Sequence, residues 1–153
     1  MRRTLIAAVI ALCLAACHSN LPTAPGEVGL VGSLRARAES AIGPGPADGP
    51  ALLVRVIVTN RGAAPDSVKV TGCTVLVRVE VRAPSGATTV YDDGQPPCAA
   101  IVTRIALTPS AADTLYRSVD LSTLGSGARS GARLTTEARF DGLTLDAGSV
   151  VIP

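Results

Sequence analysis

The sequence predicts an all-β fold: an Ig-like antiparallel β-sandwich of seven to nine strands. Two observations carry this prediction. Apolar and polar residues alternate with a period of two in several short segments, and turn sequences rich in Gly, Pro and Asn separate these segments every eight to twelve residues or so. Such alternation is typical of two packed antiparallel sheets, each with one buried and one solvated face. A jelly roll or a small barrel is the alternative all-β architecture.

The strand pattern begins weakly and becomes clear after residue 50. Residues 27–39 contain alternating apolar positions and allow a first strand, with a short helix as the weaker alternative. The Gly-Pro-rich residues 40–50 predict a loop, because proline has no N–H to donate to a ladder. The expected domain therefore spans 27–153, with 51–153 as its best-defined part.

Each later strand is expected to place alternate residues in the core. The sets expected to share a buried face are Leu52/Val54/Val56/Val58, Val75/Val77/Val79/Val81 and Leu134/Thr136/Ala138/Phe140. Shorter strands are expected over 68–70, 88–91, 101–107, 115–121, 143–145 and 150–152. The sequences Asn60-Arg61-Gly62, Pro84-Ser85-Gly86 and Asp141-Gly142 predict turns. Residues 122–131 are small and glycine-rich and predict a loop or a weak turn of helix.

The N-terminal residues have the order of a secretory signal peptide. Arg2 and Arg3 precede an apolar run that ends at Leu14-Ala15-Ala16-Cys17. This run is shorter than the roughly 20 apolar residues of a membrane-spanning helix. The four residues resemble the lipobox of bacterial lipoproteins, while ordinary secretion with a chance cysteine is the alternative. The resemblance implies a signal-peptide helix over 1–16, and on Cys17 a thioether-linked diacylglycerol with an amide-linked acyl chain such as palmitate.

Residues 17–26 are expected to form a flexible, lipidated tether, because they are polar and interrupted by proline. The residue after Cys17 is His18 rather than Asp, which in bacteria resembling the enteric ones implies the outer membrane rather than the inner one. We therefore expect a lipid-anchored location in the cell envelope, on either its periplasmic or its surface face.

Composition excludes several classes of function. The chain has 14 basic and 12 acidic residues, and removal of Arg2 and Arg3 with the signal peptide leaves 12 of each. A net charge near zero argues against a nucleic-acid partner. The aromatic residues are Tyr91, Tyr116 and Phe140. So few aromatic faces argue against stacking on sugars or on single-stranded nucleic acid.

The cysteines predict one disulfide. Cys13 is removed with the signal peptide and Cys17 is acylated, which leaves Cys73 and Cys98 as an even pair in an oxidising compartment. A metal pair or a reactive thiol is the alternative. Two cysteines without nearby histidines make a poor zinc site, which usually needs four ligands.

No catalytic constellation is evident in the domain. The single histidine, His18, lies in the tether, so no imidazole can activate a nucleophile there. Serine–lysine chemistry would have to depend on Lys69, which is expected on the outward face of a short strand. Asp92 and Asp93 lack the spacing of a calcium loop and are better interpreted as part of a turn. We expect no enzyme activity, no metal and no small-molecule cofactor.

Arg78, Glu80 and Arg82 alternate outward along one strand. They could bind an acidic partner, but a solvated face with cross-strand ion pairs is the better interpretation.

A longer motif carries a family resemblance. The segment from Leu53 to Val58-Thr59-Asn60-Arg61-Gly62, followed by Gly86 with Val90-Tyr91-Asp92 and then by 105–110, resembles the intracellular proteinase inhibitor family (BsuPI-like). The resemblance covers about residues 51–152 and implies an Ig-like fold and proteinase inhibition. Ser110 stands where the family has Gly and Ala111 where it has an acidic residue, and no inhibitory residue can be carried over.

These observations together predict a lipid-anchored cell-envelope module that binds or assembles with another envelope protein. Its membrane contact is the lipid on Cys17, and its protein contact would use sandwich loops or an exposed edge strand. Proteinase inhibition of the BsuPI-like type is the alternative function.

Overall fold

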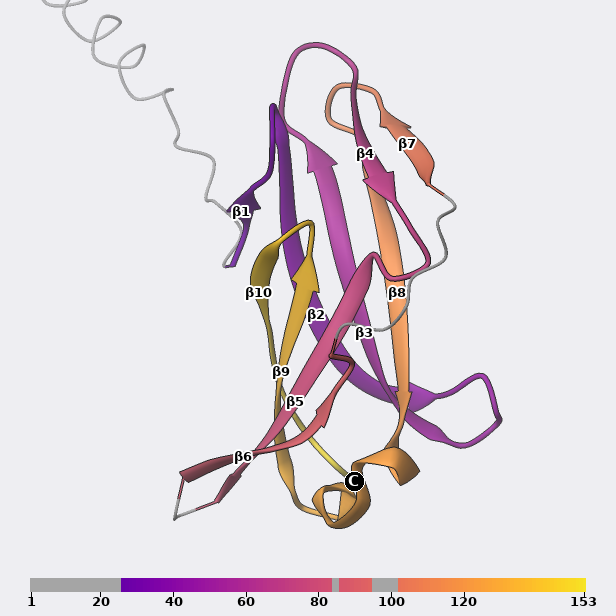
Figure 1. Cartoon of the computed structure of the whole chain (residues 1–153), viewed down its shortest axis with the longest axis vertical. Coiled ribbons are helices and arrows are strands. Elements are labelled where there is room, and N and C mark those ends of the chain that lie inside the picture. Colours follow the sequence, from indigo (N-terminus) through magenta and orange to yellow (C-terminus); the bar gives the residue numbers. More distant parts are fainter. Residues whose placement is uncertain (1–25, 84–85, 95–101) are drawn as a thin grey trace, which may run out of the picture.

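The computed structural model describes residues 26–83, 86–94 and 102–153. Within these residues ten strands pair antiparallel in two four-stranded sheets and one two-stranded ribbon (Figure 1). The strands are β1 Val28–Gly29, β2 Leu34–Pro44, β3 Pro50–Asn60, β4 Asp66–Val70, β5 Val75–Ala83, β6 Gly86–Asp92, β7 Thr103–Leu107, β8 Ala112–Asp120, β9 Arg133–Phe140 and β10 Leu143–Val151. The sheets have the orders β1-β2-β3-β8 and β10-β9-β5-β6, and β4 pairs with β7.

The two sheets pack face to face around one core. Alternate residues of β3, β5 and β9 are buried in a single cluster that draws on both sheets. All four residues predicted inward on β3 and all four on β9 are buried, and on β5 Val75, Val77 and Val79 are. The order β2-β3-β8 opposite β5-β9-β10 is that of strands A-B-E opposite C-F-G in Ig-like domains. The predicted all-β sandwich is confirmed.

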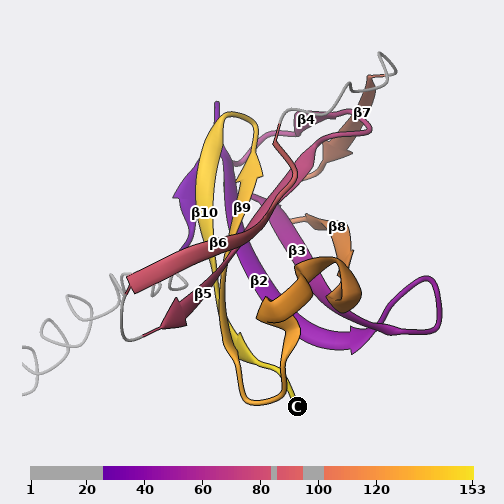
Figure 2. The same ribbon diagram turned by 60° about the horizontal axis from the view of Figure 1, so that its bottom comes forward.

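The loop predicted over residues 40–50 is wrong in its extent. β2 continues to Pro44 and β3 begins at Pro50, so only 45–49 form the turn. The two prolines pair with each other in the last rung of the ladder. Proline is tolerated there because a strand end needs no further N–H donor. Figure 2 shows this hairpin extending away from the body of the sandwich.

A 3₁₀ segment, η2 (Leu121–Ala128), closes one end of the sandwich, which confirms the short helical turn allowed by the glycine-rich residues (Figure 2). Leu121 and Leu124 are buried on it. Gly127 packs so closely on β6 that an added Cβ would lie 2.9 Å from Cγ1 of Val90. The segments 143–145 and 150–152, expected as separate strands, lie largely on β10, whose register shifts between Asp146 and Ser149.

The opposite end of the sandwich is organised by one buried amide, that of Asn60 at the end of β3. Its Oδ1 accepts hydrogen bonds from the Ser33 hydroxyl and from the Gly62 N–H, each at 2.8 Å. Its Nδ2 donates to the carbonyl oxygens of Ala64 at 2.8 Å and Leu107 at 3.0 Å. The turn expected at 60–62 is thus part of a larger hydrogen-bond network that joins two loops and the end of β7.

Residues 1–25 lie outside the described part of the chain, and so do the predicted signal peptide and all of the predicted tether except Gly26. Among the described residues, no helix has the length and apolar character needed to cross a bilayer.

Asn60→Ala is expected to lower the free energy of unfolding by about 3–4 kcal/mol, because four side-chain hydrogen bonds at about 1 kcal/mol each are lost in the interior. Asn60→Asp keeps the shape but turns an acceptor toward two carbonyl oxygens. Its stability should therefore recover as the pH falls and the new carboxyl protonates. Urea unfolding at pH 7 and pH 4 measures both effects. Thr144→Ala on the exposed face of β10 is the control and should change stability by less than about 0.5 kcal/mol.

Candidate functional site

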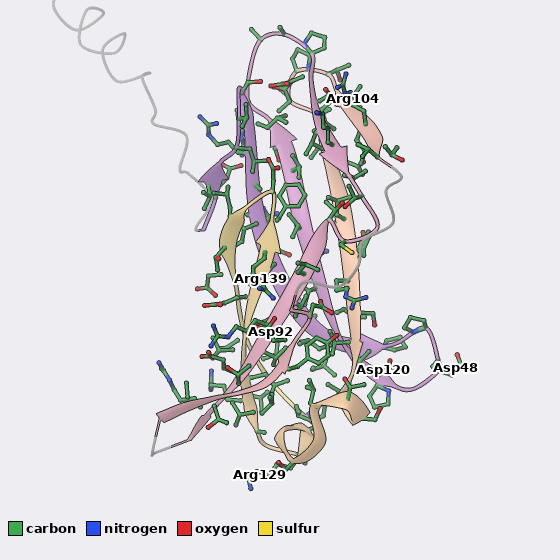
Figure 3. All side chains as sticks on the ribbon, viewed as in Figure 1. Asp48, Asp92, Arg104, Asp120, Arg129 and Arg139 are labelled. Atoms are coloured by element: carbon green, nitrogen blue, oxygen red, sulfur yellow. The ribbon has the colours of Figure 1, made fainter. Side chains whose placement is uncertain are left out.

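The two outer faces of the sandwich differ in chemistry. The outer face of β10-β9-β5-β6 carries paired charges: Nη2 of Arg78 lies 2.8 Å from Oε1 of Glu80, and Arg139 pairs with Asp92. Figure 3 shows Arg139 and Asp92 beside each other on this face. It is a solvated face, as the alternation on β5 predicted, although the Arg78–Glu80 pair runs along the strand rather than across it.

The outer face of β1-β2-β3-β8 instead contains a hollow of about 450 Å³. Strand register sets two rows of side chains across it. One row is Ala41–Leu53–Ser118, and the next is Glu39–Arg55–Tyr116. Ala41 and Ser118 have small side chains and leave space above the first row, so Leu53 between them forms the apolar floor of the hollow. Tyr116 stands at the rim and is 74% exposed. We call these six residues the Tyr116 face.

Two further arginines on β2, Arg37 and Arg35, give the surroundings of this face an excess of positive charge. Arg37 and Arg55 both pair with Glu39, and Nε of Arg55 donates to Oε2 of Glu39 at 2.7 Å. One carboxylate therefore serves two guanidinium groups. Arg35, further along β2, donates to the Leu34 carbonyl oxygen at 2.8 Å. A partner with carboxylate groups would complete the neutralisation that Glu39 begins.

Arg117 borders the hollow and joins the two sheets. Arg117 is opposite Val54 and faces the interior of the sandwich. Its guanidinium therefore points toward the other sheet and reaches the carboxylate of Asp93, just after β6. Nε of Arg117 donates to Oδ2 of Asp93 at 3.1 Å. The Tyr91 hydroxyl donates to Oδ1 of Asp93 at 2.7 Å, and the Val77 N–H donates to Oδ2 at 2.8 Å. We call Arg117, Asp93 and Tyr91 the inter-sheet clamp.

The clamp changes the acidity of its members. Burial alone would raise the pKa of Asp93, but hydrogen bonds from Arg117, Tyr91 and the Val77 amide, with the charge of Arg117, hold that pKa below its ordinary value. The Asp93 side chain is only 5% exposed. Burial raises the pKa of Tyr91, and its hydrogen bond to Asp93 raises it further. Asp93 and Arg117 are therefore both ionised at neutral pH.

The Tyr116 face has the chemistry of a binding surface. Oγ of Ser118, a residue that lines the hollow, is covered by its neighbours and has no hydrogen-bond partner among the described residues. In the described part of the chain, no group of three or more His, Cys, Asp or Glu side chains could hold a metal ion. The arrangement provides an apolar floor, an aromatic rim and guanidinium groups, which together suit a side chain or peptide segment from another protein.

The residues singled out from the sequence are placed as follows. Cys17, His18 and Cys98 lie outside the described residues, and Cys73 is half-buried in the turn between β4 and β5. Lys69 is exposed on β4, as expected. Asp92 accepts the Gly94 N–H at 2.7 Å, which is the turn expected there. The prediction that Asp93 belongs to the same turn is incomplete, because its side chain is buried against Arg117.

Sequence reasoning missed Tyr116 and Arg117 as members of a site. The alternation of β8 contained a signal for both, because two adjacent residues of one strand point to opposite faces. If Tyr116 faces outward, its ring is exposed and Arg117 faces the other sheet; if Tyr116 faces inward, Arg117 is on the outer face. The first arrangement places both residues in unusual surroundings, which is the signal of a site.

Arg117→Ala is expected to lower the free energy of unfolding at pH 7 by about 2 kcal/mol, because it leaves a buried carboxylate without its counter-charge. The pKa of Asp93 is depressed in the folded state, so its stabilisation is present above the unfolded value of about 3.9 and is lost as the pH falls through the folded pKa.

The stability gap between wild type and Arg117→Ala should therefore shrink below about pH 4. Urea unfolding between pH 3 and pH 7 measures the gap, with the exposed Arg133→Ala as control. A gap that is constant over this range would contradict the clamp.

With the fold and this surface described, comparison of the chain with protein-family models and with curated proteins gives no match.

Proposed function

We propose that this chain is a lipid-anchored cell-envelope module without catalytic activity, and that the Tyr116 face binds another envelope protein. The observation that carries the proposal is the 74% exposed Tyr116 at the rim of an apolar hollow. Exposed aromatic side chains next to a pocket are characteristic of interface hot spots, and arginine is enriched with them. Among the described residues, the charge-paired outer face of the other sheet carries no exposed aromatic side chain.

The location of the hollow also supports binding rather than catalysis. Its floor is the sheet itself, and Glu39, the carboxylate that lines it, is engaged by two arginines. A general base would need a free titratable group aimed at a bound substrate. The hollow instead offers shape and charge, which is what protein recognition requires.

The proposed anchor is the lipid on Cys17, placed by the resemblance of 14–17 to a lipobox. The proposed disulfide between Cys73 and Cys98 is supported by the path of the chain on either side of Cys98. Gly94 lines the same hollow as Cys73, and Thr103 pairs with Val70, three residues before Cys73. The two described ends of segment 95–101 therefore both lie near the turn that contains Cys73.

Mass spectrometry of the mature protein tests both modifications. We expect the chain to begin at residue 17 with diacylglycerol and an acyl chain attached, and we expect no alkylation of Cys73 or Cys98 until a reductant is added. Cys17→Ala should abolish lipidation and release the protein from the membrane fraction. Alkylation of both cysteines without reductant would refute the proposed disulfide. A mature chain without lipid would refute the proposed anchor.

Photo-cross-linking in cells tests the binding face. A benzophenone amino acid in place of Tyr116 should give one discrete protein adduct, and the adduct should weaken when Leu53→Glu places a charge on the floor of the hollow. The same group in place of Thr144, on the exposed face of the other sheet, is the matched control and should give none. Equal adducts from both positions, or no adduct from position 116, would refute the assignment of the face.

Proteinase inhibition, implied by the family resemblance, remains the alternative function. Ser110 has φ of +64°, in the left-handed region that favours glycine. The family has Gly at this position, which supports a shared turn conformation. A cross-linked protease whose activity falls stoichiometrically with added protein would favour this alternative over assembly.

A further inference from the structure

The end of the sandwich held by Asn60 is a platform of three loops with few charges. Residues 30–33, 62–65 and 108–111 contain no ionisable side chain, and Arg61, which begins the second loop, is paired with Glu27. The Ser110 N–H donates to the Asn60 carbonyl oxygen at 2.9 Å, and the Arg61 N–H donates to that of Ser33 at 3.0 Å. Val31, in the first loop, is 85% exposed, the highest value among the large apolar residues of the described chain that are exposed. Such exposure on a fastened loop has no packing role within the domain.

Two basic side chains lie beside this platform without an acidic partner. Lys69 of β4 is directly opposite Arg104 of β7, and both are exposed. Within the described residues neither makes an ion pair. Like charges directly opposite each other destabilise a ladder unless an anion lies between them. Figure 3 shows Arg104 at the loop end of the molecule, away from Asp48, Asp120 and Arg129.

The valine and the basic pair belong to one surface. Val31 and Lys69 line the same hollow of about 300 Å³. Asp66 and Asp141 line it too, but the Asp66 carboxylate is taken up by the amides of Ser33 and Ser67 and by the Ser33 hydroxyl. The surface thus combines an exposed apolar side chain and two cations that make no ion pair with the carboxylates of Asp66 and Asp141. An exposed apolar side chain beside unpaired cations is the combination found where a protein contacts an anionic membrane interface.

We propose that this loop end lies on the phospholipid bilayer, with Val31 in the headgroup region and Lys69 and Arg104 on anionic headgroups. The inference rests on the proposed lipid anchor, because one valine and two cations do not hold a domain on a membrane unaided. Eight residues lie between Cys17 and Gly26, so the extended chain between them spans at most about 32 Å, and Val31 follows Gly26 by five residues. The tether therefore permits the contact, and surface chemistry selects it over the charged opposite end.

The protein contains no tryptophan, so a single introduced indole reports its own depth. The full-length lipidated chain is purified in detergent as Val31→Trp or Val151→Trp and reconstituted in vesicles of brominated phosphatidylcholine with phosphatidylglycerol. Val151 is an exposed valine near the η2 end and is the matched control. We expect at least about twofold stronger bromine quenching at position 31, because the indole enters the interface. Ala63→Trp, on a neighbouring loop, is a second reporter and should follow position 31.

The charge requirement is tested on the Val31→Trp protein. Lys69→Glu with Arg104→Glu should reduce quenching at position 31 in vesicles with phosphatidylglycerol, while Arg133→Glu should not. Equal quenching at positions 31 and 151 in a lipidated chain would overturn the orientation and leave the anchor intact. A mature chain without lipid on Cys17 would overturn the anchor and this inference together, so the two failures are distinguishable by mass.

Discussion

The buried amide of Asn60 is the interaction on which one half of this molecule depends. A sandwich core of valines and leucines is non-directional, so it holds two sheets together but does not fix how their loops are arranged. Asn60 supplies that direction, because its side-chain oxygen accepts two hydrogen bonds and its side-chain nitrogen donates two. These four bonds fasten two loops and the end of β7. Because the side chain is fully buried, each of these bonds replaces one that water cannot supply. The loop end is consequently a fixed platform.

The inter-sheet clamp does the corresponding work on an open side of the sandwich. Where β2 approaches β10, the Ser40 hydroxyl donates to the Ala147 carbonyl oxygen at 2.9 Å and the sheets meet directly. At β8, an edge strand of its sheet, Arg117 reaches across to Asp93 instead. An inward-directed charge on an edge strand also hinders a foreign strand from pairing with it. Strand addition at β8 is therefore disfavoured. This favours the Tyr116 face over the β8 edge as the surface that contacts a partner protein.

The sequence contained most of the fold because its pattern is local. Val54, Val56 and Val58 alternate with polar or partly exposed residues. A strand with these three valines on its inner face buries them together, whereas a shift of one residue would expose all three. The extent of β2 could not be read, since prolines 44 and 50 are breakers in isolation and become harmless only when they face each other at a ladder end. The clamp was beyond reach for another reason: Arg117 and Asp93 are 24 residues apart and on different sheets. Similarly, Tyr116 becomes a rim only through the register that places Ala41 and Leu53 beside it.

The two proposed contacts occupy different parts of the molecule, and this separation has a mechanical consequence. The loop platform lies at the end of the strands, whereas the Tyr116 face lies on the flank of β2, β3 and β8. With the platform on the bilayer, the strands run away from the membrane surface. The Tyr116 face is then oriented parallel to the membrane, toward neighbouring proteins. A lipid anchor alone would leave the domain free to rotate on its tether, so that a partner would meet the face in few encounters. Valine and cation contacts that fix the orientation reduce this loss and favour a partner held in or near the same membrane.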